Sequence, residues 1–408
     1  MNPSSTGWIT KHLHTLQKKP TLLNKSEEEI YTQLRKSGFL YGVSVSSLTI
    51  ENKVSLKWIE AERTKVNLFD ILYYTYSINT ANPDGFLKTT IGFYEKLNIE
   101  DKNFLGIASR RKSNEETLER IFQERIQTNE SLIQKNFSHL ITNALLFLDV
   151  LAFDYYIKKG EDPLNYASTL EALIMNTVWL ALTKKEDKSH YDQLLLKLFE
   201  KSLRYNKDLI QDVKDISELV FKNYSTNLEK RYILDLACLT VWNDEKVDEQ
   251  EFTFIKDLGK QLGLQEAVVL DSENYVNVFI KSHRNDISYL NYSNPVKHFY
   301  NQTSRTVRIL ILRNKKRLIT ELSESKELLV LLSQSTYREL NKNEKKKVKS
   351  QLLDICKSIP SLAIFLLPGG GILLPLLIKF IPELLPSAFN ENKFEEIDNR
   401  QIPPSSNN

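Results

Sequence analysis

Three carboxylates stand close together near the middle of the chain, namely Asp244, Asp248 and Glu251. Hard cations prefer several carboxylate oxygens, so these residues are candidate ligands for a divalent cation. The Asp-x-Asp-x-Asp-Gly pattern of an EF-hand loop is absent. The alternative is structural: Asp248 caps a helix and Glu251 occupies the capping-box position, which leaves a solvated acidic turn between two helices.

Other residue types that carry out chemistry form no recognisable site. The six histidines form neither a His-Glu-x-x-His motif nor a metal-ligand spacing with Cys238 or Cys356. A dinucleotide fingerprint, a Walker loop and a Gly-x-Ser-x-Gly motif are also absent. Asp149 and Glu171 fall in apolar stretches, where we predict buried structural acids with partners. The sequence therefore predicts a protein that is not an enzyme.

The composition indicates which secondary structure carries these residues. The chain has 408 residues, of which 41% are hydrophobic and 26% are charged, so it can bury a core. It contains only 12 glycines and 12 prolines, which favours long helices. Its 55 lysines and arginines nearly balance 52 aspartates and glutamates, so net charge indicates no specific DNA binder. We predict an all-α fold of multi-helix bundles.

Local signals place several of these helices. Residues 26–29 and 113–116 have the capping-box pattern, and residues 341–344 begin with an asparagine that can cap a helix. The apolar stretches 140–153 and 167–183 are each interrupted by polar side chains. Because they lack 18 uninterrupted apolar residues, we predict buried core helices there and not membrane spans.

The acidic passage resembles part of a known helical domain. Residues 228–280 resemble the TerB-like tellurite-resistance domain, which joins an apolar helix through an acidic turn to a helix that opens with glutamate. Asp244, Val247 and Glu251 match that pattern, whereas Glu245 stands where the family prefers glycine. The resemblance implies a helical hairpin region within the larger bundle.

The segment Ser358–Ile378 contains no charged residue. At about 1.5 Å per residue a helix of this length would cover ~31 Å, about the thickness of a bilayer core. Prolines and glycines interrupt the segment, and each proline inside a helix removes a hydrogen bond. Three alternatives are open: a kinked transmembrane helix, a re-entrant or in-plane hairpin turning at Gly369–Gly371, and a hairpin packed on the helical body.

A basic cluster precedes this apolar segment. By the positive-inside rule it predicts that the bulk of the chain stays in the cytoplasm, with membrane lipid as a partner. A bacterial inner membrane is the expected location. The alternative for these lysines is a solvated helix face. The cluster consists of Lys342, Lys345, Lys346, Lys347, Lys349 and Lys357.

Residues 340–389 also resemble the membrane segment of the Letm family, the leucine zipper–EF-hand-containing transmembrane proteins. The resemblance rests on the proline spacing and on the closing Leu-Pro-Ser-x-Phe sequence. A long helical region that ends in this segment resembles bacterial Letm-related, biofilm-associated proteins. The residues assigned to the membrane segment are Pro360, Pro368, Gly369, Gly370, Gly371, Pro375, Lys379, Pro382 and Pro386.

The resemblance implies a membrane-associated protein with a role in cation and proton homeostasis, or in envelope and biofilm function, and the ribosome as a partner. One segment per chain cannot enclose a pore, so transport would require a homo-oligomer. Gly371 stands where the family often has an intramembrane glutamate, and the chain stops 19 residues after Phe389. We therefore expect the ribosome-binding domain that follows the segment in that family to be missing. The alternative function is a non-transporting helical scaffold anchored by its C-terminal segment.

These considerations predict four regions. They are an N-terminal helical region at 1–160, a helical domain at 161–300, basic helices with the Letm-like segment at 301–389, and a disordered tail at 390–408.

Overall fold

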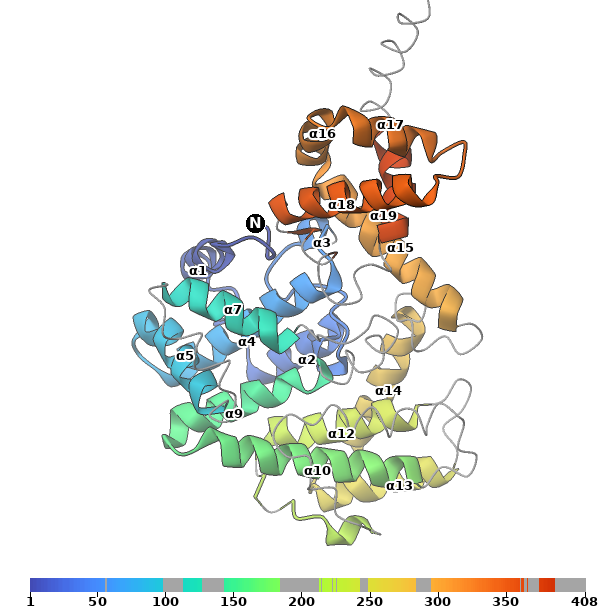
Figure 1. Cartoon of the computed structure of the whole chain (residues 1–408). Helices are drawn as coiled ribbons and strands as arrows, with labels where there is room; N and C mark the ends of the chain where they lie inside the picture. Colours follow the sequence, from blue (N-terminus) through green and yellow to red (C-terminus); the bar gives the residue numbers. More distant parts are fainter. Residues whose placement is uncertain are drawn as a thin grey trace, which may run out of the picture. The chain divides into compact units, whose positions relative to one another are not determined.

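The computed structural model describes most of the chain, and Figure 1 shows the arrangement of its helices. The part described consists of α-helices and short 3₁₀ helices without a strand, so the all-α prediction is confirmed. The described residues are 1–55, 57–97, 113–126, 143–183, 213, 215–221, 223, 224, 226–242, 249–283, 295–359, 361, 362, 365 and 374–385.

Residue contacts divide the chain into two compact units. We call the described residues up to His283 the N-terminal unit and those from Pro295 to Leu385 the C-terminal unit. The predicted boundary at residue 160 and the predicted tail stay predictions.

The N-terminal unit contains eleven described α-helices. They are α1 (Trp8–Lys18), α2 (Glu27–Ser37), α3 (Asn52–Ser55), α4 (Glu60–Asn79), α5 (Phe86–Leu97), α7 (Asn114–Ile126), α9 (Leu146–Lys159), α10 (Pro163–Thr183), α12 (Asn227–Val241), α13 (Glu249–Gln261) and α14 (Glu266–His283). Three 3₁₀ helices lie at Phe39–Tyr41, Pro83–Gly85 and Ile216–Glu218.

The predicted caps form where the sequence places them. The Glu29 amide donates to the Ser26 hydroxyl over 3.3 Å, and the Ser26 amide donates to the Glu29 carboxylate over 2.8 Å. The Asn341 side chain and Glu344 exchange the same pair of bonds, at 2.9 and 2.8 Å. Residues 113–116 supply the corresponding side-chain cap for α7, at 3.2 Å. These bonds satisfy amides that the first helical turn cannot pair, so the helices begin there.

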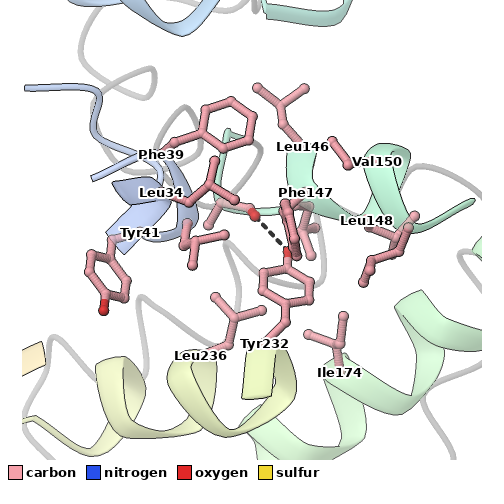
Figure 2. Packing of buried hydrophobic residues seen from close by; sticks show 14 of the residues in the cluster. Leu34, Phe39, Tyr41, Leu146, Phe147, Leu148, Val150, Ile174, Tyr232 and Leu236 are labelled. Carbon is pink, nitrogen blue, oxygen red and sulfur yellow. Dashed lines mark hydrogen bonds between the residues drawn. The ribbon is translucent and has the colours of Figure 1, made fainter. Parts of the chain in front are cut away.

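The core of the N-terminal unit lies where α9 packs against α4 and α10, and where α10 packs against α12. Figure 2 shows aromatic and aliphatic side chains of α2, α9, α10, α12 and the 3₁₀ helix Phe39–Tyr41 meeting around Phe147. The Phe147 ring lies 5.1 Å from that of Tyr232, and the Tyr232 hydroxyl donates to the Ala144 carbonyl over 2.6 Å. Both apolar stretches predicted as core helices, now α9 and α10, are buried as expected.

The buried acids have the structural role that was predicted. Asp149 is fully buried and accepts hydrogen bonds from Arg125 Nε at 2.9 Å and from the Tyr94 hydroxyl at 3.3 Å. Glu171 is also buried and has interaction partners. An ionised carboxylate is tolerated inside a protein only with such partners, so these residues stabilise the bundle.

The turn after α2 requires glycine at position 38. Gly38 has φ +74°, and a Cβ atom there would overlap the Val43 carbonyl oxygen and lie 2.6 Å from Phe279 Cζ. We expect Gly38→Ala to lower the free energy of unfolding by roughly 2–3 kcal/mol, from backbone strain plus overpacking. Gly160→Ala is the matched control, because Gly160 has φ +67° and nothing within 4 Å of the added Cβ. Equal losses in the two variants, measured by urea unfolding, would contradict this account.

The C-terminal unit is a smaller helical assembly. It comprises α15 (Pro295–Arg313), α16 (Lys315–Ser323), α17 (Lys326–Gln334), α18 (Lys342–Ser358) and α19 (Leu374–Leu384). Within it α19 packs against α15 and α17, and α17 packs against α16 and α18. The arrangement buries leucine-rich faces from all five helices and leaves α18 with one side toward solvent.

Candidate functional site

The basic helix α18 has one apolar face and one lysine-rich face. Val348, Leu352, Ile355 and Cys356 are buried, because their spacing of three or four residues places them on one side of the helix. This side packs on α16 and α17. The lysines are therefore carried on the remaining surface of a helix that the core holds in place.

Three of these lysines form a stripe along α18. Lys342, Lys346 and Lys349 are exposed and follow one another at i, i+4 and i+7. In the part of the chain that the structure describes, no ion pair engages any of the three. We call Lys342, Lys346 and Lys349 the lysine stripe.

The other lysines of α18 are paired. Lys347 Nζ lies 2.6 Å from Glu327 Oε1, Lys357 Nζ lies 2.7 Å from Asp354 Oδ1, and Lys345 Nζ lies 3.7 Å from Glu339 Oε2. The same helix thus contains exposed lysines with an acidic partner and exposed lysines without one. This difference separates candidate binding residues from residues that stabilise the surface.

The acids of this unit are already engaged by its cations. The hydrogen bond from Arg338 and the backbone amide of Asn341 lower the pKa of Glu344 to about 2. The hydrogen bond from Lys347 lowers the pKa of Glu327. Both carboxylates are ionised at neutral pH, and each is paired with another cation. They therefore do little to neutralise the positive charge of the lysine stripe.

The whole unit is strongly basic although the chain is not. Residues 295–385 contain 16 lysines and arginines against 7 aspartates and glutamates, whereas the rest of the chain contains 39 against 45. The balanced net charge of the chain therefore hides a charge separation between its two parts. A surface of this kind attracts polyanions such as nucleic acids or anionic lipid headgroups.

At its first residues the apolar segment Ser358–Ile378 does not form a new helix. Helix α18 ends at Ser358, and Ile359 has an extended backbone with φ −111° and ψ 104°. Ile359 precedes a proline, and a residue before proline is pushed out of the helical region by the proline ring. No helix among the described residues is long and apolar enough to cross a membrane.

Helix α19 contains the described end of the apolar segment. Leu374, Leu376, Leu377, Phe380 and Ile381 are all buried, on a helix that packs against α15 and α17. The turn at Gly369–Gly371 lies outside the described residues, so the three alternatives for the segment stay predictions.

A charged side chain from α15 covers part of α19. The Arg308 guanidinium lies over the Phe380 ring, 4.5 Å from its centroid, and 3.9 Å from the Glu383 carboxylate. Sequence reasoning missed this pairing of α15 with α19, because no local pattern signals a partner more than 70 residues away.

Only part of the predicted membrane set can be placed. Pro375 is exposed at the second position of α19, where a proline costs no hydrogen bond, and Pro382 lies inside the helix. Lys379 is exposed on the same helix. The remaining predicted residues, Pro360, Pro368, Gly369, Gly370, Gly371 and Pro386, lie outside the described residues.

The predicted cation site can be examined at one residue. Glu251 is buried in the first turn of α13, and it has interaction partners. Asp244 and Asp248 lie outside the described residues. Among the residues described, no group of three or more potential metal ligands occurs. Because two of the three predicted ligands are not described, the divalent cation site stays a prediction.

Comparison with known proteins gives one result for the C-terminal part of the chain. Residues 340–402 match the family model described as LETM1-like, RBD. No curated protein and no solved structure matches the chain. The match includes the lysine stripe, α18 and α19, and it corrects the expectation that no part of the family's RBD is present. Residues 340–402 are thus similar to the LETM1-like RBD family.

Proposed function

We propose that the C-terminal unit binds the ribosome through the lysine stripe of α18. The observation that carries this proposal is that Lys342, Lys346 and Lys349 lie inside the residues that match the LETM1-like RBD model. Ribosome association is what this domain family suggests. The N-terminal unit would then serve as a helical scaffold.

The chemistry of the stripe suits ribosomal RNA. Lysine binds phosphate as a compact point charge, and each neutralised phosphate releases counterions, which provides affinity without sequence specificity. Adjacent turns of the helix place the three ammonium groups in one row, so they can contact successive phosphates. Double-stranded RNA is recognised largely by shape and backbone contacts, which requires no base-reading side chains.

Other roles rest on the family resemblance alone. Cation and proton homeostasis, a biofilm or envelope role, lipid contact at a bacterial inner membrane and homo-oligomerisation stay predictions, as does the TerB-like nature of residues 228–280.

We expect replacement of the lysine stripe by glutamine to weaken binding to purified 70S ribosomes by about 10–100-fold near 100 mM salt. The slope of log K against log salt should fall by about 2–3, since up to three phosphate contacts are lost. Filter binding or sedimentation across a salt series measures both quantities. The matched control replaces Lys345, Lys347 and Lys357 by glutamine, which removes equal charge from lysines that have acidic partners.

Two results would refute this function. One is wild-type protein that does not sediment with ribosomes even at low salt. The other is a control variant that loses as much affinity and as much salt dependence as the stripe variant, because the stripe would then have no special role.

A further inference from the structure

The N-terminal unit contains a cavity of about 240 Å³ to which no function has been assigned above. Residues of α2, α4, α9, α10 and α12 line it. Its volume falls between a ~150 Å³ apolar cavity that binds benzene and the roughly 300 Å³ lower limit of drug-sized pockets. A ligand of one ring with a short chain is therefore the right size.

The inner wall of the cavity is apolar. Leu34 from α2 and Phe147 and Val150 from α9 contribute to it, and Figure 2 shows these three side chains together in the core. At the rim Ile78 is 52% exposed, which leaves an apolar side chain at the entrance. The wall favours a hydrocarbon body over a polar one.

The lining also contains a carboxylate held beside aromatic rings. The Tyr166 hydroxyl donates to Glu229 Oε1 over 2.5 Å, and the Tyr155 ring stacks on Tyr166 with centroids 4.5 Å apart. Glu229 Oε2 accepts from the Thr226 amide over 2.9 Å. Each carboxylate oxygen can accept a further hydrogen bond, so a donor entering the cavity has an acceptor ready.

A tyrosine hydroxyl in the lining makes no hydrogen bond to the described residues. Tyr74 is only 7% exposed, and its hydroxyl makes no hydrogen bond within the described part of the chain. Burial and the nearby Glu27 carboxylate raise the pKa of Tyr74, so the hydroxyl stays protonated. The hydroxyl can therefore form a hydrogen bond with a polar ligand atom.

The charges around the cavity favour a cation. Asp154 is paired with Lys158 at 2.7 Å, which neutralises both. The other charged groups of the lining are the carboxylates of Glu27 and Glu229 and the exposed ammonium of Lys159. The lining therefore has one more negative charge than positive charges. Aromatic faces next to carboxylates are the surroundings that stabilise an organic ammonium ion.

We propose that this cavity binds a small primary amine with an aromatic body. The ring occupies the space between Leu34, Phe147 and Val150. The ammonium group donates to Glu229 and lies near Tyr166, and Tyr74 supplies a further polar contact. This site is independent of the ribosome-binding function proposed for the C-terminal unit.

Titration calorimetry of the full-length chain with 2-phenylethylamine tests the proposal. We expect saturable binding in the sub-millimolar to millimolar range, as for a ligand of this size. Binding of 3-phenylpropionate and 2-phenylethanol should be at least ~10-fold weaker, since they lack the charge that Glu229 complements. No heat from the amine up to several millimolar, or equal binding of the acid, would overturn the proposal.

Three variants locate the site. Val150→Trp fills the cavity and should abolish binding. Glu229→Gln keeps a capping-box residue, so the helix start is preserved, and should weaken amine binding about 10-fold. Tyr74→Phe should weaken it several-fold, while the matched control Tyr73→Phe should not, because Tyr73 does not line the cavity. Unchanged binding in both Glu229→Gln and Tyr74→Phe would refute the site even if Val150→Trp fails to fold.

Discussion

Replacing Arg35 by alanine is expected to lower the free energy of unfolding of the N-terminal unit by about 3–5 kcal/mol. Arg35 and Asp235 are both almost fully buried, at 1% and 0% exposure, and form a two-point ion pair. Arg35 Nε donates to Asp235 Oδ2 over 2.7 Å, and Nη2 donates to Oδ1 over 2.8 Å. The alanine variant leaves the Asp235 carboxylate buried without a cation, which accounts for the large loss.

Neighbouring side chains make the pair part of a larger junction. The Tyr31 hydroxyl also donates to Asp235, over 2.8 Å, and the Arg35 guanidinium lies 5.0 Å from the Tyr31 ring and 5.1 Å from the Tyr275 ring. Arg35 Nη2 donates to the Ser272 hydroxyl over 2.6 Å. The junction therefore joins α2 to α12 and α14, and its loss should affect all three helices.

Urea unfolding followed by tryptophan fluorescence measures the effect. Asp271→Asn is the control: Asp271 also pairs with Arg35, at 2.6 Å, but it is 52% exposed and should contribute less than ~1 kcal/mol. The double variant Arg35→Met with Asp235→Leu should recover part of the loss, because it removes both charges together. A double variant less stable than Arg35→Ala would show that buried charge is not the cause.

The second large effect is expected at Phe380 in α19. Phe380 is 3% exposed and carries Arg308 over its ring at 4.5 Å. Phe380→Ala should cost the C-terminal unit about 3–5 kcal/mol, as truncation of a buried aromatic side chain generally does. Lys379→Ala on the same helix is the matched control, because Lys379 is exposed and its loss should have little effect.

The position of the tryptophans allows the two units to be followed separately. The four tryptophans, Trp8, Trp58, Trp179 and Trp242, all precede residue 295. Hydrogen exchange of peptides from 295–385 should therefore accelerate at least ~100-fold in Phe380→Ala, while the fluorescence transition stays unchanged. Slow exchange across α15 and α19 in that variant would show that their packing does not depend on Phe380.

Local chemistry explains which elements could be predicted. The caps at Ser26 and Asn341 involve a side chain and an amide three residues apart, so the sequence alone carries the whole interaction. The core helices α9 and α10 follow from apolar stretches that acidic side chains interrupt, because a charged side chain inside a bilayer is costly. The low glycine and proline content predicted the all-α class for the same local reason.

The candidate site was predicted only in part. The lysines of α18 were recognised as a cluster, but their division into free and paired residues depends on Glu327 of α17, which the fold brings to Lys347. The composition of the apolar segment fits either a bilayer or a protein core, because both environments are apolar. Among the described residues α19 packs on α15 and α17, a long-range contact that composition does not reveal.

The sequence by itself determined the helices, their caps and the basic character of the C-terminal region. Only the tertiary structure decided the partners of the buried charges and the presence of a cavity. Arg35 and Asp235 are 200 residues apart, and the cavity is lined from α2, α4, α9, α10 and α12. Local patterns report interactions within a few residues, whereas long-range pairs arise when separate helices bury their apolar faces against one another.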